Sequence, residues 1–143
     1  MDRIDAFVRD DRMIEHFAMS VETAEDGFAR VTAPVRDEFL NSHGVAHGAL
    51  IFAVIDVAFA IAVNAAVDAV GVQWSFNILR SARTGDRVSA ECRLIHPGSR
   101  LKVVEYEVRN QEGSLLAKGQ ATALPVHQTH AAGPDAPWQA VEE

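Results

Sequence analysis

Residues 49–66 read ALIFAVIDVAFAIAVNAA, an apolar stretch with one ionisable side chain, that of Asp56. A helix of this length reaches about 27 Å, which is close to the thickness of a bilayer core. In a membrane, Asp56 would lie near the middle at a cost of about 2.5–3.5 kcal/mol, and no Lys or Arg flanks the stretch closely enough to orient it. We therefore predict that it forms the buried central helix of a globular fold.

At 100° per residue, this helix sorts its side chains by size. Bulky aliphatic residues occupy most of its surface, and small or polar residues form one narrow stripe. This small stripe consists of Ala49, Ala53, Asp56, Ala60 and Asn64. Another backbone or a substrate can approach such a stripe closely, whereas the bulky side of the helix fits against a sheet.

The sequence after Gly71 alternates between apolar and polar residues, as expected for strands with one buried face. Four such runs, at 72–78, 88–94, 104–108 and 115–123, are separated by turn sequences. One or two further strands are predicted between residues 18 and 35, with a hairpin turn at 25–27. Residues 4–17 have helical spacing, which the Asp10-Asp11 pair interrupts, so they form one helix or two short ones. The fold class is α+β, with a long central helix wrapped by a curved antiparallel sheet.

The length of 143 residues indicates one domain. We expect residues 1–125 to form it, with residues 1–17 as an N-terminal helical segment, and residues 126–143 to be a flexible or loosely docked tail. The net charge of −7 argues against a nucleic-acid binder that uses a basic surface. Residues 73–124, however, hold 8 Lys and Arg against 5 Asp and Glu, which suits an anionic small molecule.

The single cysteine, Cys92, excludes an intrachain disulfide and fits a reducing compartment. It alternates with polar residues on a predicted strand, so we expect it in the core. The first eleven residues alternate charged and apolar side chains and lack the features of a signal or transit peptide. These features favour a cytoplasmic protein.

Residues 41–49 read NSHGVAHGA and precede Asp56. This pattern resembles the signature of the phenylacetate-degradation (PaaI-type) branch of the hotdog thioesterases. That branch has an Asn, then His-Gly-Gly or His-Gly-Ala six residues later, then an Asp eight residues after the first Gly. Residues 77–86, NILRSARTGD, are similar to a strand end of the family that usually reads F-L-R-P-A-x-x-G-D. The resemblance covers about residues 15–124. It implies a hotdog fold that hydrolyses acyl-CoA thioesters, with no cofactor besides the coenzyme A of the substrate.

Gly48 and Asp56 are the main candidates for the chemistry. The N–H of Gly48 is one of the orphan donors in the first turn of the helix, and the resemblance assigns it to the oxyanion hole. An aspartate in an apolar helix is costly unless it is paired or reaches a cavity, which leaves a structural role open beside a catalytic one. The resemblance implies that Asp56 is the general base or nucleophile for a substrate held by the facing subunit. The active unit would be a homodimer, and dimers would pair into a tetramer.

Three neighbouring residues are assigned to the same site. Asn41 is a turn former by composition, and the resemblance makes it a catalytic residue that orients water or the thioester. His47 is expected to pack or hydrogen-bond at the helix start, next to the substrate. Val57 departs from the family, which often has Thr directly after the Asp to position water. His43 and His47 are too few ligands for a metal site, so none is predicted.

Four basic residues are candidates for binding the phosphates of coenzyme A, although each alone is equally a solvated charge. They are Arg80, Arg83, Arg100 and Lys102. Two other functions stay open. A hotdog hydratase or dehydratase pairs its Asp with a nearby His, and residues 57–61 contain none. A non-catalytic acyl-CoA sensor gains nothing from a buried carboxylate, so Asp56 counts against it.

Overall fold

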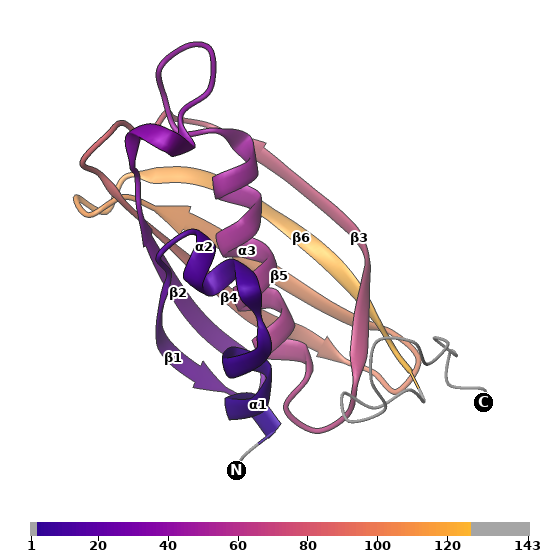
Figure 1. Ribbon diagram of the computed structural model, residues 1–143. Coiled ribbons are helices and arrows are strands. Elements are labelled where there is room, and N and C mark those ends of the chain that lie inside the picture. Colours follow the sequence, from indigo (N-terminus) through magenta and orange to yellow (C-terminus); the bar gives the residue numbers. More distant parts are fainter. Residues whose placement is uncertain (1–2, 127–143) are drawn as a thin grey trace.

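The structure is a computed structural model that describes residues 3–126, and at its centre lies the long helix α3 (Gly48–Val63). A single six-stranded sheet curves around this helix (Figure 1). The strand order is β1-β2-β4-β5-β6-β3, and every neighbouring pair is antiparallel. The predicted α+β architecture, a central helix wrapped by a curved antiparallel sheet, is confirmed.

The strands lie where the alternating runs predict them, and both strands expected before residue 35 are present. They are β1 (Ser20–Glu25), β2 (Phe28–Pro34), β3 (Ala69–Ile78), β4 (Arg87–Pro97), β5 (Lys102–Arg109) and β6 (Leu115–Pro125). The hairpin turn between β1 and β2 requires a residue in the left-handed region, and Gly27 fills it with φ +81°. Pro34 is the last residue of β2, as a residue without an N–H donor should be.

Side chains cap both ends of α3. At the N-terminus, His47 Nδ1 accepts the N–H of Ala49 at 2.9 Å. At the C-terminus, Asn64 Nδ2 donates to the carbonyl of Ala60 at 2.8 Å, and Asn64 Oδ1 accepts the N–H of Ala69 at 2.8 Å. The helix therefore ends at Val63 and not at residue 66, because Asn64 ties its last turn to the start of β3.

Two short helices precede the sheet, α1 (Arg3–Asp10) and α2 (Arg12–His16). The break between them is a capping site, because Asp11 Oδ1 accepts the N–H of Met13 at 3.0 Å. Of the two alternatives that the sequence left open, the structure has two helices. In Figure 1 they cross in front of α3, while the sheet lies behind it. A single 3₁₀ turn, η1 (Asp37–Phe39), leads from β2 toward α3.

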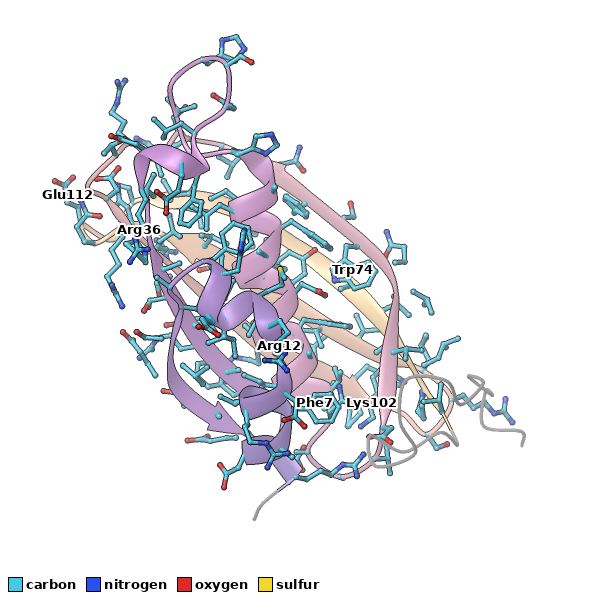
Figure 2. The ribbon with its side chains drawn as sticks, in the orientation of Figure 1. Phe7, Arg12, Arg36, Trp74, Lys102 and Glu112 are labelled. Carbon is cyan, nitrogen blue, oxygen red and sulfur yellow. The ribbon has the colours of Figure 1, made fainter. Side chains whose placement is uncertain are left out.

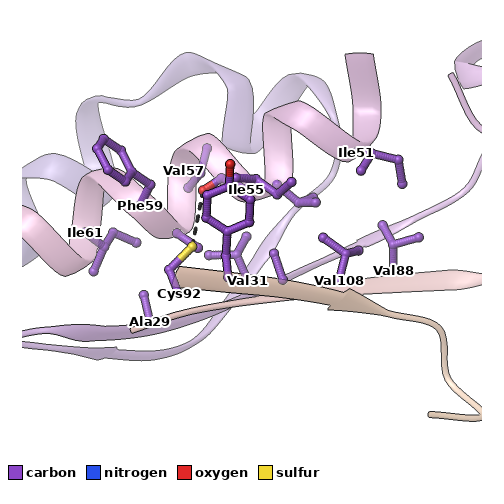
Figure 3. Close-up of a cluster of buried hydrophobic side chains, with 14 of the residues drawn as sticks. Ala29, Val31, Ile51, Ile55, Val57, Phe59, Ile61, Val88, Cys92 and Val108 are labelled. Carbon is purple, nitrogen blue, oxygen red and sulfur yellow. Dashed lines mark hydrogen bonds between the residues drawn. The ribbon is translucent and has the colours of Figure 1, made fainter. Parts of the chain in front are cut away.

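The core fills the space between α3 and the concave face of the sheet (Figure 3). The alternating residues of β4 and β5 point into it, including Val88, Val108 and Cys92, which are fully buried. The Sγ of Cys92 donates to the carbonyl of Ile55 at 3.5 Å, and burial raises the pKa of this thiol far above its usual value. Cys92 is a core residue, as predicted.

β3 departs from the predicted pattern. We expected Val72, Trp74, Phe76 and Ile78 to form one buried face, but Val72 and Ile78 are 50% and 51% exposed. A register shift between Gly71 and Gln73 breaks the alternation at Val72, and β3 is an edge strand with β6 on one side only. Two of the four side chains expected on the buried face are therefore exposed within residues 3–126.

The predicted tail begins one residue too early. Val126 is buried, and its N–H donates to the carbonyl of Asp68 at 2.9 Å, so residue 126 belongs to the folded part. Residues 127–143, which we expected to be a flexible tail, lie outside the described residues. Over residues 3–126, no helix combines the length and apolar character needed to span a membrane.

Candidate active site

The side chain of Asn41 holds the loop before α3 in shape. Its Oδ1 accepts the N–H groups of His43 at 2.9 Å and of Val45 at 3.3 Å. Such local bonds are the usual reason for an Asn in a tight loop. Within residues 3–126 nothing accepts a hydrogen bond from Asn41 Nδ2. The oxygen of the amide thus serves the turn, and its nitrogen is available to a substrate.

The loop is also tied to the turn that follows β3. Ala46 N–H donates to the carbonyl of Ala82 at 2.8 Å, and His47 N–H donates to the carbonyl of Phe39 at 2.8 Å. The two stretches that carry the family resemblance, residues 41–49 and 77–86, therefore lie side by side at the N-terminal end of α3. They are far apart in the sequence, but the sheet brings the end of β3 back to the start of α3.

A pocket of about 360 Å³ opens between these two stretches. It brings together three of the predicted site residues, Asn41, Gly48 and Arg80. The other residues that line it are His43, Val45, Ala46, Ile51, Ile78, Ser81 and Ala82. We call it the polar pocket, because Asn41, His43, Arg80 and Ser81 line it. Loop, helix start and strand end form a site on one side of the molecule.

The N–H of Gly48 is a second free donor in this pocket. Gly48 is the first residue of α3, and no group in residues 3–126 accepts its N–H. The neighbouring N–H of Ala49 is taken by His47 Nδ1, and that of Leu50 by the carbonyl of His47 at 3.0 Å. One amide at the positive end of the helix dipole therefore stays available for an oxygen atom.

His43 and His47 do not converge on one point. His43 lines the polar pocket, whereas His47 lines a second pocket on the other side of the helix start. The Nδ1 of His47 is already used as the helix cap. The position of His47 is that of a residue that packs and hydrogen-bonds at the start of the helix, as predicted.

Within residues 3–126, Asp56 lies on the one side of α3 that other elements do not fully cover. Ala49 is exposed, and Ala53, Asp56 and Ala60 are partly exposed, so most of the small stripe faces outward. Asn64, at the end of the stripe, is buried and serves as the cap of the helix.

The carboxyl of Asp56 has an unusual pKa. Burial, and after it the nearby negative charge of Asp11, raises the pKa of Asp56 to about 6. A carboxyl with a pKa close to neutral is both ionised at physiological pH and a usable proton acceptor. A pKa that is shifted by desolvation together with a specific neighbouring charge is typical of functional sites.

Val57 does not share this open side. Its side chain is buried, and Figure 3 shows it on the side of α3 that faces away from the sheet. The prediction that residue 57 lies next to the substrate is therefore not supported by its position within the chain. A one-residue step along a helix turns the side chain by 100°, which takes Val57 from the open stripe into the core.

The four basic residues fall into two groups at opposite ends of α3. Arg80 lines the polar pocket, and Arg83 stands in the following turn, where its N–H donates to Asp86 Oδ2 at 2.8 Å. Arg100 and Lys102 lie at the other end. Lys102 is buried, and its Nζ donates to the carbonyl of Val63 at 3.3 Å, so it caps the last turn of α3 (Figure 2). Within one chain, the two groups do not form one phosphate site.

Sequence reasoning missed two features of the site. Asp11 contributes to the pKa of Asp56, although 45 positions separate them. The second pocket beside Gly48 is built partly from His16 and Phe17, which had no assigned role. The sequence contains no local signal for either, because both depend on how α2 packs against α3.

The chain is similar to known proteins over most of its length. Residues 43–117 match the family model described as the thioesterase superfamily. The acyl-coenzyme A thioesterase PaaI of Escherichia coli is 30% identical over 113 residues, which are 78% of this chain and 81% of that protein.

Solved structures agree. The PaaI protein from the phenylacetic acid degradation operon of E. coli superposes with a TM-score of 0.85 at 27% identity and covers 89% of this chain and 93% of that one. A hypothetical thioesterase of Streptococcus pneumoniae, solved with coenzyme A, has a TM-score of 0.78 at 28% identity and covers 88% and 98%. The chain therefore belongs to the thioesterase superfamily and is an enzyme of its hotdog-fold, PaaI-type branch.

Proposed function

We propose that this enzyme hydrolyses acyl-CoA thioesters to a free acid and coenzyme A. The observation that carries the proposal is the unshared N–H of Gly48, at the positive end of α3 and inside a polar pocket. The tetrahedral intermediate of acyl transfer places a negative charge on the former carbonyl oxygen. A fixed N–H donor at a helix N-terminus stabilises that charge.

The second group is Asp56 of a facing subunit. Gly48 and Asp56 of one chain are about 12 Å apart along the helix, too far to act on one carbonyl. If two α3 helices pair antiparallel, the Asp56 of one copy comes beside the Gly48 of the other, with Phe52 midway. The open small stripe supports such close approach, because alanines allow two helix backbones to come near each other.

The reaction then needs few groups. As a base, the Asp56 carboxylate takes a proton from water while the water oxygen attacks the thioester carbon. The intermediate collapses, the carbon–sulfur bond breaks, and coenzyme A leaves as a thiolate that takes up a proton. As a nucleophile, the carboxylate attacks the same carbon and displaces coenzyme A as a thiolate, which takes up a proton. Water then hydrolyses the resulting anhydride to the free acid and the Asp56 carboxylate. In this proposal, Asn41 Nδ2 holds the water or the thioester.

The edge of the sheet supports a homodimer as the smallest active unit. No strand within residues 3–126 pairs with the outer edge of β3, and Val72 and Ile78 on this strand are half exposed. Soluble proteins protect such edges, and pairing with a second copy is one way to do so. Light scattering distinguishes a dimer from a tetramer made of two dimers.

The same pairing explains the two groups of basic residues. When Gly48 faces the partner's Asp56, the partner's helix end at Val63 falls beside the loop that begins at Asn41. Arg80 and Arg83 of one copy then lie on the same cleft as Arg100 of the other, whereas Lys102 is buried and caps the last turn of α3. We propose that this cleft holds the phosphates of coenzyme A. Because Cys92 is the only thiol and is buried, we also propose a reducing compartment, the cytoplasm, as the location.

The test removes the backbone N–H donor of residue 48. Gly48→Pro deletes the N–H, and Pro is favoured at the first position of a helix. His47 already has the extended backbone, φ −62° and ψ 143°, that a following Pro requires. We expect kcat for thiol release from acyl-CoA to fall by about 10²–10³.

Gly48→Ala is the matched control. It keeps the N–H, and its Cβ meets only Ile78 Cδ1 at an ordinary 3.8 Å. It should retain most of the activity. Equal activity of the Pro and Ala variants would remove Gly48 from the mechanism. Binding of coenzyme A by the wild type without thiol release from any thioester would instead indicate an acyl-CoA sensor.

A further inference from the structure

A pocket of about 610 Å³ lies at the C-terminal end of α3, the end opposite Gly48. It is built by α1, the loop after α3, the β4–β5 turn, the start of β5 and the end of β6. We call it the far pocket, and its walls include Arg3, Asp68, Ser99, Lys102, Pro125 and Val126. Figure 2 shows Lys102 at this end of the molecule. No residue lines both the far pocket and the polar pocket, so within one chain they are separate cavities.

Asp68 brings a buried oxygen atom without a donor to the far pocket. The residue is only 6% exposed. Its Oδ1 pairs with the guanidinium of Arg3, and its backbone carbonyl accepts the N–H of Val126. Its Oδ2 has no hydrogen-bond partner within residues 3–126. Because buried polar atoms are nearly always hydrogen-bonded in folded proteins, this oxygen is an unused acceptor for a ligand.

Lys102 brings unused donors to the same pocket. It is 8% exposed, and its Nζ donates to the carbonyl of Val63 at 3.3 Å. An ammonium group has further N–H donors, for which residues 3–126 supply neither a second acceptor nor a carboxylate. Lys102 and Asp68 therefore line one pocket without pairing with each other. A buried charge is costly unless it is paired, so the ammonium favours an anionic ligand group.

Apart from Arg3 and Ser99, the other side chains that line the far pocket are apolar. They include Val67, Pro97 and Pro125. A ligand that covers them with an apolar group removes hydrocarbon surface from water. An apolar cavity of roughly 150 Å³ is enough for benzene, so the far pocket has room for a side chain of that size together with a polar head.

We propose that the far pocket binds a free α-amino acid with an apolar side chain. The ammonium of the ligand donates to Asp68 Oδ2, its carboxylate accepts from Lys102 Nζ, and its side chain covers the apolar wall. Hydrogen bonds between charged groups are roughly twice as strong as those between neutral ones. A free α-amino acid carries both charges and the apolar group on one carbon atom. The far pocket takes no part in the proposed hydrolysis, so binding there is tested independently of it.

Calorimetric titration of the full chain with L-phenylalanine and with L-leucine tests the proposal. Two analogues of L-phenylalanine each lack one charge, because 3-phenylpropanoate has no ammonium and 2-phenylethylamine has no carboxylate. We expect both amino acids to bind and both analogues to bind more weakly than L-phenylalanine by about tenfold or more. Binding of neither amino acid, or equal affinity for L-phenylalanine and its two analogues, would overturn the site.

Two variants remove the charged partners of the ligand. Lys102→Met keeps an unbranched side chain without the ammonium, and Asp68→Asn removes the negative charge at nearly constant shape. Each should weaken the binding of L-phenylalanine by about tenfold or more, with circular dichroism as the check on folding. Unchanged affinity in both folded variants would refute the assignment of the two charges.

A filling variant covers the case in which the loss of a buried charge loosens the fold. Val67 is 45% exposed, so Val67→Trp should fold and place a large ring in the far pocket, where it blocks the ligand. Ile95→Trp is the matched control, since Ile95 is also 45% exposed but does not line this pocket, and it should bind like the wild type. Binding that survives Val67→Trp would place the amino acid elsewhere. Displacement of L-phenylalanine by coenzyme A would assign the far pocket to the substrate and overturn the proposal.

Discussion

Gly48 and Asp56 both lie on the incompletely buried side of α3, about 12 Å apart along its axis. A carbonyl oxygen bound to the N–H of Gly48 is therefore out of reach of the Asp56 carboxylate in the same chain. In the mechanism that we propose, each chain holds one half of two sites, and antiparallel pairing of two copies completes both. The kinetics, pH dependence, stability and assembly of the enzyme should all reflect this relationship.

Replacement of Asp56 by Asn should abolish most of the turnover. The side chains have nearly the same shape, so the fold should survive, and kcat should fall by about 10²–10⁴, the usual contribution of a general base. Thiol release from acyl-CoA measures the loss. Asp26→Asn, the same chemical change in an exposed hairpin turn, should have no effect. An unchanged kcat in a folded Asp56→Asn protein would exclude a catalytic role.

The activity should rise with pH through a midpoint near 6. Asp56 must be ionised to accept a proton, and its pKa is about 6 because of burial and of Asp11. A pH profile of kcat measures this acid limb. Asp11→Asn removes the neighbouring charge and should move the midpoint to lower pH. A midpoint that stays in place in Asp11→Asn would show that burial alone sets the pKa.

The free energy of unfolding should decrease over the pH range in which the activity rises. The folded state raises the pKa of Asp56 from 3.8 to about 6, so it binds a proton more tightly than the unfolded chain does. Ionisation of Asp56 then destabilises the fold as pH rises from about 4 through about 6. Asp56→Asn should increase the free energy of unfolding by about 1–3 kcal/mol at neutral pH.

Urea unfolding at two pH values checks this expectation. The stabilising effect of Asp56→Asn should disappear below about pH 4, where the wild-type carboxyl is protonated in both states. A variant that is less stable than the wild type at neutral pH would indicate that Asp56 has a structural partner in the assembled enzyme.

A charge in the small stripe should separate the subunits. Ala53 and Ala60 lie on the open side of α3, and Ala53→Arg or Ala60→Arg places a long charged side chain where the second helix approaches. We expect a smaller particle by light scattering and loss of activity. Ala66→Arg, an exposed alanine beyond the end of α3, is the control. A monomeric Ala53→Arg protein with full activity would refute the shared site.

Val57→Thr restores the hydroxyl that the family often has. Val57 is buried away from the open side, so the new hydroxyl should bond the carbonyl of Ala53 and stay far from the substrate. We expect a neutral effect or a gain in kcat below tenfold, which is less than about 1.4 kcal/mol of barrier. Steady-state kinetics with circular dichroism as a folding control measure it. A loss of more than tenfold in a folded variant would show that residue 57 is coupled to Asp56.

The sequence by itself determined the architecture, because periodicity is local. The apolar stretch around Asp56 specifies a buried helix, and the alternation of β4 and β5 specifies strands with one buried face. The spacing of Asn41, Gly48 and Asp56 also identified them as candidate site residues, because it resembles the signature of the family. What the sequence did not determine is the exposure of individual residues outside the small stripe of α3. Val57 and Lys102 appeared available to a substrate, yet both are buried.

Only the tertiary structure decided these points, because burial depends on the elements that arrive from elsewhere in the chain. The sheet carries Arg80 to Gly48 and holds Lys102 at the far end of α3. The packing of α2 brings Asp11 toward Asp56, and it builds the second pocket beside Gly48 partly from His16 and Phe17. Desolvation, which sets the pKa of Asp56, is a property of that packing and has no counterpart in the spacing of residues along the chain.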